Sequence, residues 1–248
     1  MLEELLERRE RECRLIPELA LQTLDEAEAF LHDRGLLTRN PSLSLPSLFG
    51  ACHEEPYKPG SGGFGEWPIT KWPRSFELAR RPGVAAPKIH LGKTLYLSGA
   101  TARLADPIIC AELDRLREAD PDWARVLDHL RDAGPSTPDD LLVELGLERR
   151  HLKAIRAPLE RCGAVVGRWE DDHNVLYRWD QLGVEPATGP PDLGPLVAAA
   201  VGAAVVVPER EPRRWFSWRW RWRDELLDEL VDGGRLVRPA PDWLAAPT

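Results

Sequence analysis

The chain has 248 residues, 43% of them hydrophobic, which is enough for one large domain or two to three small ones and excludes global disorder. Its longest apolar run, residues 196–207, is too short to cross a membrane, which takes about 20 residues. A net charge of −8 argues against non-specific coating of nucleic acid but permits local basic surfaces. The four cysteines form no C-x-x-C pair, so we expect neither a zinc ribbon nor a disulfide framework, which suits a reducing cytoplasm. No metal or cofactor is predicted.

Residues 1–121 are predicted to form an N-terminal module. A charged helical lead-in over residues 1–14 precedes a helix that begins at a capping box of Thr23 and Glu26 and ends at Gly35. Residues 40–75 are rich in proline and glycine, which predicts a long loop, and its aromatic residues favour an ordered one. A short helix over 75–81, a hairpin over 88–98 and a helix over 100–119 are expected to follow.

Residues 122–183 show the clearest pattern. Three amphipathic segments are separated by Gly134 and Gly146, and two short strands, 164–169 and 175–179, follow Gly163. Helix, helix, helix, strand, strand is the order of a winged helix-turn-helix. The sequence therefore predicts a central winged helix.

Residues 184–248 begin with a proline-rich linker and are predicted to form a C-terminal module. A helix over 196–204, a strand over 205–207, a helix over 224–231 and a strand over 235–238 are expected. A helix, a glycine and a strand follow one another three times in the chain, at Gly35, Gly163 and Gly233. We therefore expect an α+β fold of tandem winged helix-turn-helix modules with short β-hairpin wings.

The third predicted helix of the central module has an apolar stripe and a basic face. The basic residues that lie away from the stripe are Arg149, Arg150, Lys153, Arg156 and Arg161. In a winged helix this helix enters the major groove of DNA. Two features favour the alternative of a solvated face used for protein contacts: Pro158 lies within the helix, and the wing tip, residues 170–172, is acidic.

A tryptophan- and arginine-rich segment occupies residues 213–223. As a strand, it would place tryptophans on one face and Arg219, Arg221 and Arg223 on the other, suited to stacking and neutralising an unpaired nucleic-acid strand. As a helix, Trp215, Trp218 and Trp222 would form a core stripe. Burial against a neighbouring module is the favoured interpretation, and Arg219 and Arg221 remain candidate DNA contacts.

A polar cleft is the third candidate site, because four of the five lysines lie near acidic and aromatic residues within residues 52–93. Its predicted members are His53, Trp67, Lys71, Trp72, Lys88, His90 and Lys93. A salt-linked interface between modules is the alternative.

Four segments carry a resemblance to a known family: residues 45–56, residues 65–72, residues 88–98 and residues 208–218, the last reading Pro-Glu-Arg-Glu-Pro-Arg-Arg-Trp-Phe-Ser-Trp. Together they resemble AlkZ-related winged-helix proteins of bacteria over residues 20–246. These proteins are distant kin of the AlkZ/YcaQ DNA glycosylases, which stack tandem winged helices into a clamp and excise bulky alkylated or crosslinked purines. The resemblance implies a partner in duplex DNA and a role in DNA repair.

The catalytic motif of those glycosylases, Gln-x-Gln or Gln-x-Asp, is absent, because the only glutamines are Gln22 and Gln181. The prediction is therefore a cytoplasmic, nucleoid-associated DNA-binding protein. One alternative is an active glycosylase in which Glu54, Glu55 or Glu66 positions the water. The other is a non-enzymatic protein-interaction module.

Overall fold

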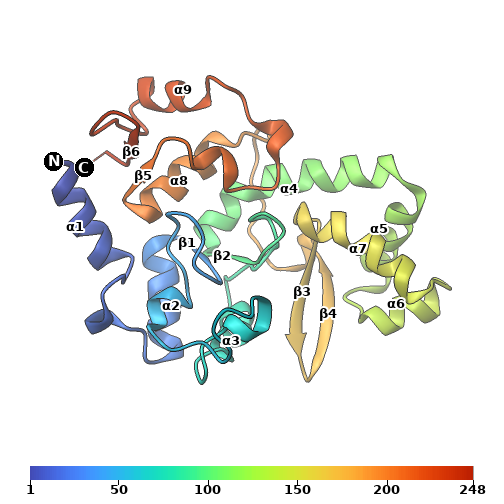
Figure 1. The fold of residues 1–248 in the computed structure, drawn as a ribbon. Helices are drawn as coiled ribbons and strands as arrows, with labels where there is room; N and C mark the ends of the chain where they lie inside the picture. The colour runs from blue at the N-terminus through green and yellow to red at the C-terminus, as the bar shows by residue number, and fades with distance from the viewer. Residues whose placement is uncertain (248) are drawn as a thin grey trace.

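The computed structural model describes residues 1–247, which form an α+β protein with small antiparallel sheets (Figure 1). The α-helices are α1 (Leu2–Glu12), α2 (Leu24–Arg34), α3 (Arg74–Arg80), α4 (Gly99–Ala119), α5 (Pro121–Ala133), α6 (Pro138–Glu144), α7 (Arg149–Arg161), α8 (Gly194–Ala204) and α9 (Leu226–Asp232). Three two-stranded sheets pair β1 (Leu36–Thr38) with β2 (Leu95–Leu97), β3 (Val165–Glu170) with β4 (His173–Arg178), and β5 (Val206–Pro208) with β6 (Trp243–Ala245). None of these helices is long and apolar enough to span a membrane.

The N-terminal elements follow local sequence signals. The predicted capping box begins α2, where the Thr23 hydroxyl accepts from the backbone N–H of Glu26 at 3.1 Å. Gly35 ends the helix at a φ of +80°, a conformation that favours glycine, and the chain turns directly into β1. The predicted hairpin is present but irregular: a turn at Leu91-Gly92 joins arms linked at His90 and Lys93, while β2 also pairs with β1.

The long loop between β1 and α3 is ordered by aromatic packing. It contains only short 3-10 turns, as its prolines and glycines predict. Trp67 lies at its centre, with ring centroids 4.5 Å from Phe64, 5.6 Å from Phe49 and 5.8 Å from Phe76. The loop is therefore a packed surface element, as the aromatic content predicts.

The central segment contains α5, α6, α7 and the β3–β4 hairpin, in the predicted order. Asp120 caps α5 and Thr137 caps α6, so both helices begin where the side chains supply acceptors for free backbone N–H groups. A separate core fills this segment, with Val126, Leu130 and Leu159 fully buried in it. α7 continues through Pro158 to Arg161.

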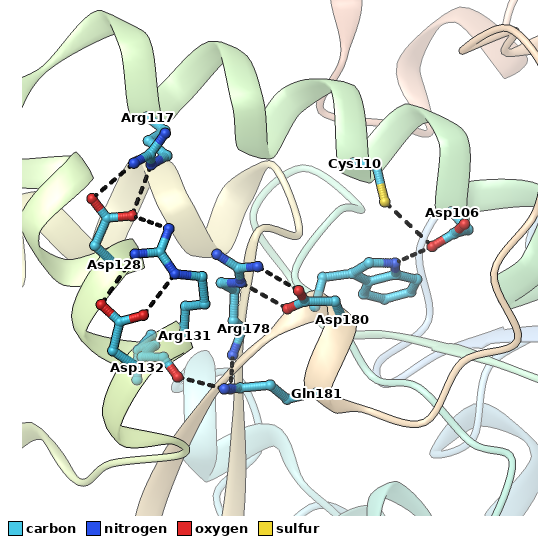
Figure 2. Close-up of polar contacts among 11 residues, drawn as sticks. Asp106, Cys110, Arg117, Asp128, Arg131, Asp132, Arg178, Asp180 and Gln181 are labelled. Atoms are coloured by element: carbon cyan, nitrogen blue, oxygen red, sulfur yellow. Dashed lines mark hydrogen bonds and ion pairs between the residues drawn. The ribbon is translucent and has the colours of Figure 1, made fainter.

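Asp106 on α4 anchors the central segment to the rest of the chain (Figure 2). Its carboxylate accepts the indole N–H of Trp179 at 2.7 Å and the backbone N–H of Ala187 at 2.9 Å. Trp179 is fully buried, and Gln181 also donates to the carbonyl of Leu130. One buried carboxylate therefore fixes both the end of the hairpin and the start of the following linker.

The C-terminal elements differ from expectation in two places. The predicted strand over 235–238 is wrong: Val237 makes only an isolated bridge to Ala245, and the partner of β5 is β6 instead. The Trp/Arg segment, residues 213–223, is neither a strand nor an α-helix: two short 3-10 turns, Pro212–Arg214 and Arg219–Arg221, are joined by irregular chain. The predicted burial is confirmed for Trp215 and Trp218, which are both fully buried.

The largest core joins the two ends of the chain. Leu36 and Ile109 from the first half pack in one cluster with Val197, Trp215 and Leu244 from the second. A smaller cluster packs α1 against β5 and β6, so the lead-in helix is not simply solvated: Leu5 and Cys13 are buried there. The division into modules at 121 and 183 and their tandem winged-helix nature stay predictions.

Candidate nucleic-acid interface

The basic residues of α7 differ in their exposure and partners. Arg150, Lys153 and Arg161 are exposed, and these side chains extend away from the apolar stripe of Leu152, Ile155 and Leu159. Arg149 is also exposed and pairs with Asp139 of α6 at 2.9 Å. Arg156 is largely covered and makes two hydrogen bonds to Glu160, of 3.1 and 2.6 Å.

A groove of about 460 Å³, hereafter the α7 groove, runs along the side of α7 that carries Arg149, Lys153 and Arg156. Its lining residues are Lys88, Pro138, Leu142, Arg149, Leu152, Lys153, Arg156, Ala157 and Glu160. Lys88 reaches it from the N-terminal part of the chain by an ion pair with Glu160. Since Glu160 is shared by Lys88 and Arg156, the groove keeps an excess of positive charge.

A second hollow of about 480 Å³, hereafter the loop cleft, lies beside it. It brings together five residues that the sequence singled out: Glu66, Trp67, Lys88, His90 and Lys93. Lys88 lines both hollows, so the loop cleft and the α7 groove meet at this side chain.

Arg39 and Asn40 also line the loop cleft, and sequence reasoning missed both. The Arg39 guanidinium lies 5.1 Å from the ring centroid of Trp67 and donates to the Tyr96 hydroxyl at 3.1 Å. Their position directly after β1, at the mouth of a long loop, was the only available signal. Arg39 adds a positive charge fixed in place by an aromatic ring.

His90 is a structural residue of the cleft. It is fully buried, and its two ring nitrogens lie 2.7 Å from the carbonyl oxygen of Trp215 and 2.8 Å from the Ser42 hydroxyl. Burial lowers the pKa of His90, which favours the neutral ring. His90 therefore ties the loop region to the C-terminal segment.

Three other predicted cleft members lie outside the loop cleft and bind the chain's own groups. His53 Nε2 lies 2.7 Å from the carbonyl oxygen of Arg14, and Lys71 donates to Gln22 at 3.0 Å. Trp72 faces a neighbouring aromatic hollow, lined also by Phe64, Phe76 and Trp169. The predicted cleft is thus brought together only in part.

Of the three candidate catalytic acids, only Glu66 lines the loop cleft. Glu54 accepts from the hydroxyl of Thr70 at 2.5 Å and from the backbone N–H groups of Thr70 and Lys71. Partial burial raises the pKa of Glu54, but these hydrogen bonds outweigh it and the net pKa is lowered. Glu54 and Glu55 line a hollow with His53 that adjoins the loop cleft and shares Asn40 and Pro41 with it. Glu66 lines both this hollow and the loop cleft.

The β3–β4 hairpin packs against the N-terminal part of the chain. Trp169 lies 6.1 Å from Phe76 of α3, between ring centroids, and Arg168 donates to the carbonyl of Val84 at 3.1 Å. At the acidic tip, Glu170 accepts from the Tyr177 hydroxyl. The hairpin therefore lines one side of the aromatic hollow and is held against the N-terminal part of the chain.

Arg219 and Arg221 occupy a different surface, on the 3-10 turn beside α4. Arg219 is exposed, while Arg221 is largely covered and donates to Glu112 at 2.7 Å. No group of three or more His, Cys, Asp or Glu side chains within residues 1–247 is arranged to hold a metal ion.

The chain is similar in structure to the DNA glycosylase AlkZ of Streptomyces sahachiroi, with a TM-score of 0.57 and 13% sequence identity over 95% of this chain and 67% of that chain. No protein-family model and no curated protein sequence matches it. At this low identity the similarity shows the fold alone, and at that level the expected resemblance is confirmed. The chain has an AlkZ-like fold.

Proposed function

We propose that this protein binds duplex DNA along the α7 groove and the loop cleft, in a DNA-repair role within the nucleoid of the cytoplasm. The observation that carries the proposal is the position of Lys88, which joins the basic face of α7 to the cationic loop cleft. Lysine and arginine side chains that follow one path neutralise successive phosphates and release counterions. The AlkZ-like fold supports a partner in DNA.

In this proposal, residues 122–183 act as a winged helix that lays α7 against DNA. Arg149, Arg150, Lys153 and Arg161 contact phosphates or base edges from the exposed side of the helix. The docked hairpin with its acidic tip contributes no minor-groove contact. The modules 1–121 and 184–248 supply the walls on which this helix is held.

The test is fluorescence anisotropy with a labelled 20-base-pair duplex at several salt concentrations. For the wild type we expect affinity that falls steeply with salt. The double variant R150A/K153A, which removes two exposed charges, should bind more weakly and reduce the magnitude of the salt slope by about 2.

The matched control is R210A/R235A, which removes the same charge from exposed positions of the C-terminal segment. It should bind as the wild type does. Equal losses in the two double variants would mean that net charge, rather than α7, determines binding. If the wild type fails to bind duplex even at low salt, the proposal is overturned and the basic face of α7 serves protein contacts.

Base excision is a second candidate function, favoured by the position of Glu66. It is the one of the three candidate carboxylates, Glu54, Glu55 and Glu66, that lines the loop cleft beside Trp67 and Lys93. A carboxylate there would orient water toward a glycosidic carbon. The test is formation of abasic sites in alkylated duplex, which E66Q should abolish while E55Q should not; full activity of E66Q would exclude this role.

A further inference from the structure

The second candidate surface is built around a buried carboxylate, Glu112, in the middle of α4. Glu112 is fully buried and accepts from Arg115 Nε at 2.8 Å, from Arg221 Nε at 2.7 Å and from the indole N–H of Trp220 at 3.0 Å. Burying a carboxylate is costly unless several donors compensate it, and here two guanidinium groups and an indole do so. This arrangement fixes the ring of Trp220.

Trp220 is held in place and yet exposed. Its hydrogen bond to Glu112 fixes one edge, and the Arg115 guanidinium lies 5.1 Å from its ring centroid, but 55% of the residue remains accessible to solvent. The neighbouring Trp215 and Trp218 are fully buried, so Trp220 differs from them in its exposure to solvent. A fixed, accessible indole is a preorganised stacking surface.

A hollow of about 500 Å³ lies against this ring, within the size range of ligand pockets of about 300–1,000 Å³. Its lining residues are Glu112, Arg115, Pro190, Pro191, Asp192, Leu193, Trp220, Arg221 and Arg223. Arg115 and Arg221 share the carboxylate of Glu112. Arg223 pairs with Glu229, and the adjacent exposed Arg219 supplies a further positive charge. An indole with the Arg115 guanidinium over its ring and further arginines beside it fits a base stacked on the ring, with its phosphate on the arginines.

The Trp/Arg segment is also tied to the end of α7. The indole N–H of Trp218 donates to the carbonyl of Cys162, the residue after α7, at 3.1 Å. A strand that leaves the basic face of α7 past the exposed Arg161 therefore approaches the Trp/Arg segment.

We propose that Trp220, with Arg115, Arg219 and Arg223 around it, binds an unpaired nucleotide of a DNA strand, its base stacked on the indole and its phosphate on the arginines. The proposal rests on the proposed function for the choice of nucleic acid as the partner. Glu112 acts in it as a positioning residue, because it touches the ring and the guanidinium groups rather than the nucleotide.

The test compares three probes by anisotropy: a labelled dT decamer, a blunt 20-base-pair duplex, and the same duplex with a five-nucleotide tail. W220A should weaken binding of the decamer and of the tailed duplex about 5- to 100-fold and leave the blunt duplex unchanged. W220F keeps a ring and should recover most of the affinity. R213A, an exposed arginine of the same segment paired with Asp224, serves as the charge control and should change nothing.

E112Q should reproduce part of the loss of W220A, and Trp220 should become more accessible to iodide quenching, measured as the difference between E112Q and E112Q/W220F. A purely structural role of Glu112 would lower the melting temperature without changing that quenching. Circular dichroism of each variant checks that the fold is retained.

The two proposals fail separately. Equal decamer affinity of W220A and wild type, with duplex binding intact, overturns the Trp220 site and leaves the α7 proposal standing. Binding of the decamer that depends on Trp220, without any binding of blunt duplex, supports the Trp220 site and overturns the α7 proposal. Absence of binding to every probe overturns both.

Discussion

Replacing Asp106 tests whether one buried carboxylate joins the central segment to the rest of the fold. D106A removes the acceptor of the fully buried Trp179 indole and of the Ala187 backbone N–H. A buried donor left without a partner costs about 1–3 kcal/mol, and Ala187 is only partly buried. We therefore expect D106A to lose about 2–4 kcal/mol of unfolding free energy, which corresponds to a melting temperature lower by about 5–15 °C.

The assay is thermal and urea unfolding followed by circular dichroism, with D180A as the matched control. Asp180 is half-exposed and pairs with Arg178 on the surface, so D180A should cost about 0–1 kcal/mol. W179F removes the donor, and adding D106A to it should cost less than D106A alone. If D106A costs no more than D180A, or if the W179F background leaves its cost unchanged, the proposed anchor is refuted.

Three further predictions concern single residues. Burial lowers the pKa of His90 below its ordinary value of 6.5, so at acidic pH the unfolded chain binds more protons at this residue than the folded chain. The free energy of unfolding should therefore be highest above about pH 6.5 and fall as the pH drops below it. Melting temperatures at pH 7.5 and 5.5 should show this fall, and H90Q should reduce it; an equal fall in H90Q would contradict the assignment. G163A should destabilise the fold by about 1–3 kcal/mol more than G146A in urea unfolding. Both glycines have positive φ, but a Cβ at Gly163 would lie 3.0 Å from Ile109 and Ile89, whereas Gly146 faces open space; equal effects would mean that the two isoleucines yield. Cys110 is exposed, yet burial of its sulfur and the nearby Asp106 raise its pKa to about 12, so it should react slowly with Ellman's reagent at pH 8 in the folded protein and rapidly in urea. Rapid reaction of the folded protein would show that the thiolate is accessible.

The elements that the sequence predicts well are those with local causes. The α2 start follows from Thr23 and Glu26, and α6 begins at Thr137, whose hydroxyl accepts from the backbone of Asp140. Such signals lie within four residues of one another, so they survive in any tertiary context. The apolar stripe of α7 is equally local, and it packs as predicted.

The misassigned elements are those that depend on distant partners. Residues 235–238 alternate as a strand should, but β6 occupies the edge of β5 and leaves Val237 a single bridge. The spacing of tryptophan in the Trp/Arg segment fits both a strand and a helix. The structure has short 3-10 turns instead, and the indole groups of Trp218 and Trp220 donate to Cys162 and Glu112, which are distant in the sequence.

The candidate site was predictable in its residues more than in its geometry. Lys88, Lys93 and Glu66 were singled out by composition, and they line one cleft. The contact of Lys88 with Glu160 joins residues 72 apart in the chain, and no spacing rule predicts it. Arg39 was missed for a similar reason, because its role depends on Trp67 and Tyr96, which lie far from it in the sequence.

The packing of α1 has a consequence for synthesis on the ribosome. Its buried Leu5 and Cys13 lie against Val206 and Ala245, and the Cys13 thiol donates to the carbonyl of Ala203, 190 residues later. Chain elongation adds about 5–20 residues per second, so the apolar side of this first helix stays uncovered for about 10–50 seconds. The other side of this helix carries dense glutamate and arginine residues, and its buried side is covered only after β6 has been synthesised.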